Sequence, residues 1–322
     1  MNADPRKPLD ADAIRAALPN WNRVDVVEST GSTNADLLPQ VKEGAADRVA
    51  IVASEQTAGR GRLSRTWTAP PGAAIAVSAL FRPEGVPPTA LGLLPLVSGL
   101  AVVDMVRAVA GVDGLADDEG TPRLGLKWPN DVLLDGRKLC GILVEAASID
   151  PPALVAGIGV NVDLREDELP VPHATSLALA GAPELDRGKL AAGLLDALDK
   201  RERQWRADPA AMMADYRANC LTLGTVVRVE LPGGKELVGE AVGVREGGEL
   251  VVRAAESGEE HVVTAGDVRH LRPVDGGYAG GKGKGPGDYA GGKGKGPGDY
   301  AGGKGKGPGD YRGGAGEGGD GR

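Results

Sequence analysis

From residue 21 onwards, apolar residues fall into short blocks that predict alternating strands and helices. Residues 24–30, 48–56 and 72–81 have strand lengths and are rich in Val, Ile and Ala, as is typical of buried strands. Residues 91–110 and 185–220 carry apolar side chains at helical spacing, and a short helical pattern lies at Ile14, Ala17 and Leu18. The blocks interleave, so the pattern favours strands and helices packed in one layered domain.

Two turn signals refine this pattern. Residues 124–148 predict a strand, a hairpin and a strand, with Asp135–Gly136 as the tight turn, and residues 153–164 continue as another strand. Ser32 or Thr33 is expected to cap a helix from Asn34, with Asp36 placed as in a capping box. The hairpin requires antiparallel pairing, so we expect an α+β fold with a mixed β-sheet flanked by helices.

The pattern changes after Cys220. Residues 225–231, 236–244, 249–255 and 261–268 alternate apolar and polar positions and are separated by PGG, EGG and ESGE turns. These short strands predict a small β-barrel. We therefore divide the chain into an N-terminal extension (1–20), a main domain (21–221), a C-terminal β-domain (222–273) and a tail (274–322).

The tail is repetitive. The sequence AGGKGKGPGDY occurs at 279–289, 290–300 and 301–311, with glycine at five of its eleven positions. So much glycine, with proline and one Tyr per repeat, cannot offset the entropy of ordering, and we expect disorder. Gly281–Lys282 resembles part of a phosphate-binding loop, but Gly283 replaces the required Ser or Thr and no predicted strand or helix flanks it.

Composition separates the tail from the body. The chain has 51 glycines in 322 residues, and 23 of them lie in 276–322. Residues 276–322 carry 8 Lys and Arg against 5 Asp and Glu, which leaves 29 against 40 in residues 1–275, a net charge of −11. A body this acidic argues against a surface that coats nucleic acid.

Other patterns bear on location. No run approaches 18 consecutive apolar residues, so we expect no membrane-spanning helix. The first residues lack the apolar stretch of a secretory signal, and Cys140 and Cys220 form no CxxC pair. We expect a cytoplasmic protein.

Two segments are rich in cations. Residues 54–67, SEQTAGRGRLSRTW, follow a predicted strand and place Arg60, Arg62 and Arg65 among glycines, which suits an anion-binding loop; a solvated basic loop is the alternative. In KWPNDV, 127–132, Lys127 can stabilise a developing phosphate charge, or pair with Asp131 at the surface. Asp131 is also a weak candidate ligand for Mg²⁺.

Two further segments suit polar ligands. GSTN, 31–34, offers hydroxyl and amide groups at a helix start, where an ordinary N-cap is the alternative. GIGVNV, 157–162, lets a ligand approach the backbone and ends at Asn161, or it forms a bulged strand. Three histidines without ligand spacing make a zinc site improbable, no G-x-S-x-G elbow occurs, and Cys140 in an apolar strand is expected to be inert.

Together these segments resemble the biotin protein ligases. GSTN, EQTAGRGRLSRTW, KWPNDVLLDGRKLCGILVE and GIGVNV occur in that family's order over about 21–272, and ATSL at 174–177 is a weaker match. The resemblance implies a catalytic domain of the lipoate ligase and class II aminoacyl-tRNA synthetase type, followed by an SH3-like barrel. It implies two steps: biotin and MgATP give biotinyl-5′-AMP and diphosphate, and a lysine of a biotin carboxyl carrier domain then takes the biotin.

The resemblance also assigns residues. It implies that Lys127, Arg62 and Asp131 are catalytic, with Asp131 as the metal candidate. The biotin-binding residues would be Ser32, Thr33, Asn34, Gln56, Arg60, Gly61, Arg62, Lys127 and Gly141. The nucleotide-binding residues would be Arg60, Arg62, Trp67, Lys127, Asn130 and Asn161.

The same resemblance sets expectations for partners. The acceptor would be the carrier domain of an acetyl- or propionyl-CoA carboxylase, and the protein would be a monomer or weak homodimer. Many relatives carry a DNA-binding domain before the ligase pattern, which here begins near residue 21, so we expect no DNA partner. We also expect no membrane partner. A lipoate ligase and a non-catalytic sensor of biotinyl-AMP are the alternatives. Ser64 departs from the glycine frequent at its position.

Overall fold

The computed structural model describes residues 6–112, 123–231, 235–264 and 267–270. All of them belong to one compact unit, Met1–Gly287. The disorder expected for the tail from residue 274 lies outside the described residues.

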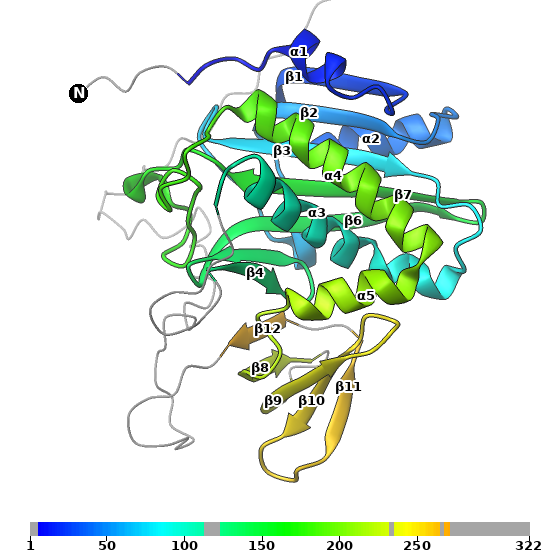
Figure 1. Ribbon diagram of the computed structural model, residues 1–322, viewed down its shortest axis with the longest axis vertical. Helices are drawn as coiled ribbons and strands as arrows, with labels where there is room; N and C mark the ends of the chain where they lie inside the picture. The colour runs from blue at the N-terminus through cyan, green and yellow to red at the C-terminus, as the bar shows by residue number, and fades with distance from the viewer. Residues whose placement is uncertain (1–5, 113–122, 232–234, 265–266, 271–322) are drawn as a thin grey trace, which may run out of the picture. The chain divides into compact units, whose positions relative to one another are not determined.

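A seven-stranded mixed sheet forms the body of the protein (Figure 1). Its strands run in the order β1-β2-β3-β7-β6-β5-β4, with β1 and β2 parallel and the other neighbours antiparallel. Their bounds are β1 Arg23–Thr30, β2 Val49–Gln56, β3 Ala74–Phe81, β4 Leu124–Lys127, β5 Asp131–Leu134, β6 Arg137–Ile149 and β7 Pro152–Asn161. The expected mixed sheet is confirmed.

The KWPND segment forms a turn that the sequence pattern did not separate. Residues 124–148 contain three strands rather than two, because Trp128, Pro129 and Asn130 reverse the chain between β4 and β5. The predicted turn at Asp135–Gly136 joins β5 to β6, and both of its residues have positive φ, as a type I′ turn requires.

Helices cover the two faces of the sheet unequally. They are α1 Ala11–Ala16, α2 Thr33–Lys42, α3 Leu94–Ala108, α4 Arg187–Ala207 and α5 Pro209–Ala218, with single-turn segments η1 Arg62–Ser64, η2 Pro88–Leu93 and η3 Glu166–Glu168. In Figure 1, α3 and α4 cross in front of the strands. Apolar residues of α1, α3 and α4 pack with Ile75, Val77 and Ile158 in the main core, whereas α2 packs in a second, smaller core with Ile51 and Leu80. The two cores lie on opposite faces because strand side chains alternate.

The start of α2 differs from the expected capping box. Ser32 is the N-cap residue, but its side chain makes no capping hydrogen bond. Asp36 instead accepts a hydrogen bond from the Thr30 hydroxyl. Ser32 is buried, and its hydroxyl does not stabilise the helix end.

One apolar segment requires a correction. Pro88–Ala108, which comprises η2 and α3, is long and apolar enough by composition to cross a membrane, although no unbroken apolar run marks it. In the fold, 72% of its most apolar window is buried inside the protein. Packing against the sheet and α4 thus accounts for its composition.

A second sheet of five strands follows the helices, in the order β11-β10-β9-β8-β12. Its strands are β8 Val226–Glu230, β9 Glu236–Val244, β10 Leu250–Ala254, β11 Glu260–Val263 and β12 Asp267–His270. Trp128 joins it to the main sheet, because its indole donates to the Gly248 carbonyl (2.8 Å) and its amide donates to the Thr222 hydroxyl (3.0 Å).

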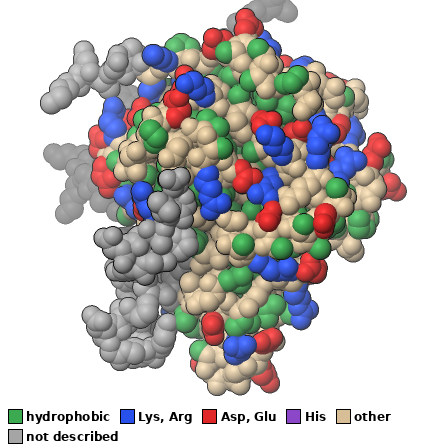
Figure 2. Space-filling view, in the orientation of Figure 1, with side chains coloured by type: hydrophobic (Ala, Val, Ile, Leu, Met, Phe, Trp, Pro, Cys, Tyr) green, Lys and Arg blue, Asp and Glu red, His purple; other side chains and the backbone are tan. Residues whose placement is uncertain are grey.

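Charged side chains on the face seen in Figure 2 are mixed in sign, without a large area of one charge.

One network of charged side chains is buried. The Arg48 guanidinium contacts Asp199 (2.6 Å) and Glu202 (2.7 Å), which are 4% and 0% exposed. Burial raises the pKa of the Glu202 carboxyl, and Arg48 opposes that shift.

We predict that Arg48→Met lowers the free energy of unfolding by about 3 kcal/mol, because two buried carboxylates lose the cation they share and keep only the more exposed Arg203 and Arg206. Urea unfolding measures the effect. Arg253 is the control, since its partners Glu240 and Glu260 are about half exposed, and Arg253→Met should cost about 0–1 kcal/mol. Equal effects of the two substitutions would contradict the role given to Arg48.

Candidate functional site

Small residues make a flat floor on the α2 face of the main sheet. On β3 and β7, Ala76 lies opposite Gly159 and Ser78 opposite Gly157, while Gly141 of β6 lies opposite Gly159. The larger neighbours Ile75, Val77 and Ile158 point to the other face and fill the main core. The alternation therefore buries the large side chains on the core face and leaves space above the small residues on the other face.

Trp67 lies directly on this floor. A Cβ atom placed on Gly159 would be 2.5 Å from Trp67 Cε2, and one on Gly141 would be 3.0 Å from Cζ3. Both glycines thus allow the indole to approach the bare backbone of β6 and β7. The Lys138 ammonium lies 5.8 Å from the ring centroid, within range of a cation–π interaction.

Neutral polar groups gather at one end of the floor, where α2 begins. Gln56 Oε1 accepts from the Thr33 amide (2.9 Å) and lies 3.1 Å from the Thr33 hydroxyl. The Ser78 hydroxyl lies 2.7 Å from Thr33 Oγ1 and 2.6 Å from Asn34 Oδ1. The Asn34 amide in turn sits over Gly157, where an added Cβ would be 2.3 Å away.

Hydrogen-bond chemistry orders the protons in this cluster. Asn34 Nδ2 faces two groups that only accept, Glu145 Oε2 (2.7 Å) and the Leu143 carbonyl (3.2 Å), so Asn34 Oδ1 must face Ser78. Ser78 therefore donates to Asn34 Oδ1, and the single proton of the Thr33 hydroxyl is within reach of both Ser78 Oγ and Gln56 Oε1. Gln56 Oε1 is satisfied by the Thr33 amide, which orients its Nε2 donor.

Residues 59–67 form a small hairpin. Gly61 N donates to the Arg65 carbonyl (2.7 Å) and Trp67 N donates to the Gly59 carbonyl (2.9 Å). At its tip, Leu63 (φ 55°) and Ser64 (φ 59°) adopt the left-handed conformation. Glycine adopts this conformation without steric cost, whereas Ser64 adopts it with some backbone strain.

The hairpin arginines point to different ends of the floor. Arg60 Nη2 pairs with Glu145 Oε2 (3.2 Å) at the neutral polar end. Arg62 Nη1 donates to Asn130 Oδ1 (2.9 Å), beside the KWPND turn. Sequence reasoning grouped Arg60 with Arg62 as anion ligands, but the structure does not bring their head groups to one place.

A cationic end forms where β4, β5 and β6 meet. Lys127 lies opposite Asp131 in the β4–β5 register, and Lys138 Nζ pairs with Asp131 Oδ1 at 2.7 Å. Burial lowers the pKa of the nearby His173 imidazole, and the charges of Lys127 and Lys138 lower it further. This end of the floor is therefore suited to negative charge.

Lys138 was missed by sequence reasoning. The available signal was its place in RKLCGILVE, three residues before Gly141, which the resemblance included without a role for the lysine. Among the described residues, no group of three or more His, Cys, Asp or Glu side chains could hold a metal ion. Asp131 is paired with Lys138, so as a magnesium ligand it would have to share that contact.

Asn161 lies on the same face of β7 as Gly157 and Gly159, at the strand end. Its Nδ2 donates to the Thr175 carbonyl (2.9 Å), and its buried Oδ1 has no hydrogen-bond partner in the described structure. A buried acceptor without a partner is costly unless a ligand satisfies it.

The whole arrangement follows β6. Glu145, Gly141 and Lys138 mark the neutral polar end, the midsection under Trp67 and the cationic end. Lys138 and Glu145 are seven positions apart on β6, and a β-bulge lies between them near Leu139. The site therefore suits an elongated ligand with a neutral polar head, an apolar middle and an anionic end.

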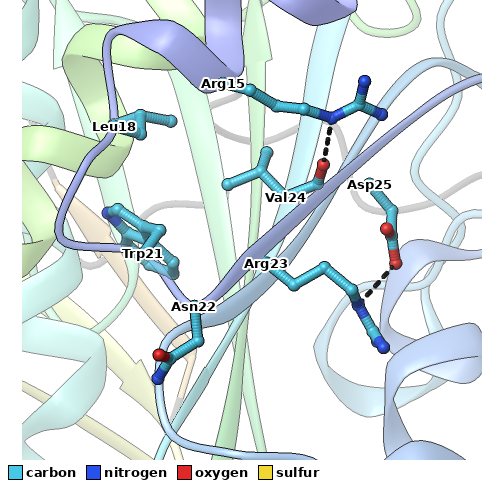
Figure 3. Close-up of a pocket in the computed structure, with 7 residues that line it drawn as sticks. All are labelled: Arg15, Leu18, Trp21, Asn22, Arg23, Val24 and Asp25. Carbon is cyan, nitrogen blue, oxygen red and sulfur yellow. Dashed lines mark hydrogen bonds and ion pairs between the residues drawn. The ribbon is translucent and has the colours of Figure 1, made fainter.

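Two other features are chemically quiet. A pocket between α1 and β1 is lined by Arg15, Leu18, Trp21, Asn22, Arg23, Val24 and Asp25 (Figure 3). Arg15 donates to the Val24 carbonyl (2.9 Å) and Arg23 pairs with Asp25 (3.1 Å), so these polar groups are already partnered.

Burial raises the pKa of the Cys140 thiol, which agrees with the inert role expected for it.

Comparisons with known proteins agree with one another. Residues 26–163 match the Biotin/lipoate A/B protein ligase family. The chain is 45% identical over 272 residues to the biotin–[acetyl-CoA-carboxylase] ligase of Mycobacterium tuberculosis, covering 83% of this chain and 97% of the relative. The biotin protein ligase of Aquifex aeolicus with biotin and ATP has a TM-score of 0.64 at 25% identity, covering 79% of this chain and 100% of that one. The Leishmania major enzyme with biotinyl-5-AMP has a TM-score of 0.51 at 25% identity, covering 78% and 99%.

We predict that Gly159→Ala displaces Trp67, because the new methyl group would occupy the position of the indole. The expected result is a changed tryptophan emission and a loss of ligand binding of about tenfold or more, the usual penalty of overpacking by a methyl group. Trp67→Phe identifies the Trp67 component of the emission. Gly243→Ala is the matched control, since nothing lies within 4 Å of its added Cβ. Unchanged emission in Gly159→Ala would show that Trp67 does not rest on this strand.

Proposed function

The chain belongs to the biotin protein ligases, and we propose that the floor under Trp67 binds biotin and ATP, joins them as biotinyl-5′-AMP and passes biotin to a lysine of a carrier domain. The single observation that carries this proposal is the order of chemistry along β6. Biotin has a neutral ureido ring, an apolar chain and a carboxylate, and the site has a neutral polar end, an aromatic midsection and a cationic end in the same sequence.

Neutral groups at the start of α2 would bind the ureido ring. Gln56 Nε2 is an oriented donor, and the Ser32 hydroxyl is not used for capping. Thr33 and Asn34 hold the donors in place from within the buried hydrogen-bond chain. We assign Ser32 and Gln56 direct contact with the ring.

Cations would promote the first step. Biotin carboxylate and ATP repel each other, and negative charge grows around the α-phosphorus as the carboxylate oxygen attacks and diphosphate leaves. Lys127 and Lys138 supply opposite charge in a partly buried site, where such stabilisation is strongest. Arg62, held by Asn130, would add a third cation as the hairpin covers the anhydride and excludes water.

Nucleotide binding would involve the far side of Trp67. The buried Asn161 Oδ1 is suited to accept a hydrogen bond from the ribose or adenine. Mg²⁺ would enter with ATP and screen its phosphates, and Asp131 is the one carboxylate we assign near it.

The second step needs no covalent enzyme intermediate. The acceptor lysine, once deprotonated, attacks the carbonyl carbon of biotinyl-5′-AMP, and AMP leaves with the bonding electron pair. We propose the carrier domain of acetyl-CoA carboxylase as acceptor, since relatives bear that name. We also propose that the five-stranded sheet is the SH3-like domain of the family and that the protein acts in the cytoplasm.

A transfer assay tests the function. We predict that the protein, with biotin, MgATP and a purified carrier domain, adds one biotin per acceptor and forms AMP and diphosphate. Mass spectrometry of the acceptor and diphosphate release measure the two steps. An acceptor whose lysine is replaced by Arg is the control. Lipoylation without biotinylation would select the lipoate ligase alternative, and binding without transfer would select the sensor.

We predict that Lys127→Met and Lys138→Met each reduce the rate of adenylate formation by about 10²-fold or more, because each removes charge aimed at the transition state. Diphosphate release at saturating biotin measures the rate, and circular dichroism checks the fold. Lys189→Met is the matched control, since Lys189 pairs with Glu184 on an exposed face of α4. Near-normal release by either site variant would remove that lysine from the proposed step.

A further inference from the structure

Glu145 is a carboxylate placed in a site built for an anionic ligand. It lies on β6 at the neutral polar end of the floor, and its side chain is 26% exposed. One oxygen, Oε2, accepts from Asn34 Nδ2 (2.7 Å) and from Arg60 Nη2 (3.2 Å). The neutral head of the proposed ligand offers no cation to this carboxylate, and both of its partners are protein groups.

The two partners of Glu145 belong to different parts of the site. Asn34 lies in the first turn of α2 and is the last member of the buried hydrogen-bond chain through Ser78. Arg60 belongs to the hairpin and lies almost directly across from Thr66 in the hairpin's bridge. The carboxylate therefore joins a rigid, buried cluster to an exposed loop by one charged contact.

We propose that Glu145 is a positioning residue that fastens the 59–67 hairpin over the site through Arg60, and that it couples hairpin closure to occupancy of the neutral polar end through Asn34. This inference rests on the proposed function and extends it. Arg60 then holds the hairpin in place and does not bind the phosphate. Arg62, Lys127 and Lys138 bind the phosphate at the cationic end.

The coupling has a physical direction. A ligand that satisfies Gln56 fixes the Thr33–Ser78–Asn34 chain, and a fixed Asn34 holds Glu145 where Arg60 reaches it. Hairpin closure in turn fixes Asn34 through the shared oxygen. Linkage requires that each event favour the other by the same factor.

Glu145→Gln separates the fastening role from packing. The glutamine carbonyl still accepts from Asn34, so the buried chain keeps its acceptor, while the charge opposite Arg60 is lost. We expect the melting temperature to stay within about 2 °C of the wild type, as for substitutions outside the core. Hydrogen exchange of residues 59–67 and the dissociation rate of biotinyl-5′-AMP should each rise by about two- to fivefold, the effect of losing one ion pair whose arginine is nearly half exposed.

A double substitution tests the pairing. Arg60→Gln should raise hairpin exchange in the wild-type background and add nothing further in Glu145→Gln, because the contact is already lost. Glu166→Gln is the matched control, since Glu166 also pairs with an arginine, Arg137, outside the hairpin, and it should leave hairpin exchange unchanged.

Clear outcomes would overturn the inference. These are unchanged hairpin exchange in Glu145→Gln, additive effects of the two substitutions, or faster exchange throughout the protein with a lowered melting temperature. Hairpin exchange is measured without ligand, so it tests the fastening even if the wild-type protein forms no biotinyl-5′-AMP. That separate failure would count against the proposed function.

Discussion

The site depends on two side chains that rest on bare backbone. Asn34 occupies the space over Gly157, and the Trp67 indole occupies the space over Gly159 and Gly141. A single methyl group at these positions would push one of them away. Because both side chains lie in contact with the sheet, the polar cluster and the aromatic midsection are placed on the most rigid part of the fold.

The same strands serve the core and the site with alternate residues. In β7, Ile158 and Val160 fill the main core beneath α3 and α4, while the alternating Gly157 and Gly159 form the floor on the other face. α2 covers only part of that face with its small apolar core, which leaves the rest for ligand. A sheet that is buried on one face and only partly covered on the other can provide stability and access together.

The field inside the site depends on where its charged side chains lie and not on the net charge of the protein. The body is acidic, yet Lys127 and Lys138 meet at the ends of β4 and β6, and Asp131 sits between them. Asp131 keeps two cations near each other, and these cations add to the effect of burial in lowering the pKa of His173. Net charge describes the surface that a partner meets at long range, whereas a few side chains decide the field inside a site.

The sequence by itself determined the element types, the mixed sheet and the segments that carry chemistry. Periodicity and turn residues are local properties, and the Asp135–Gly136 turn and the strands of 226–263 follow from them. Contacts between distant residues were decided only by the tertiary structure. It gave the KWPND turn a strand on each side, sent Arg60 to Glu145 and Arg62 to Asn130, and brought Lys138 to Asp131. Long side chains of one loop can reach either end of a site, and only the packed neighbours fix which carboxylate or amide each one meets.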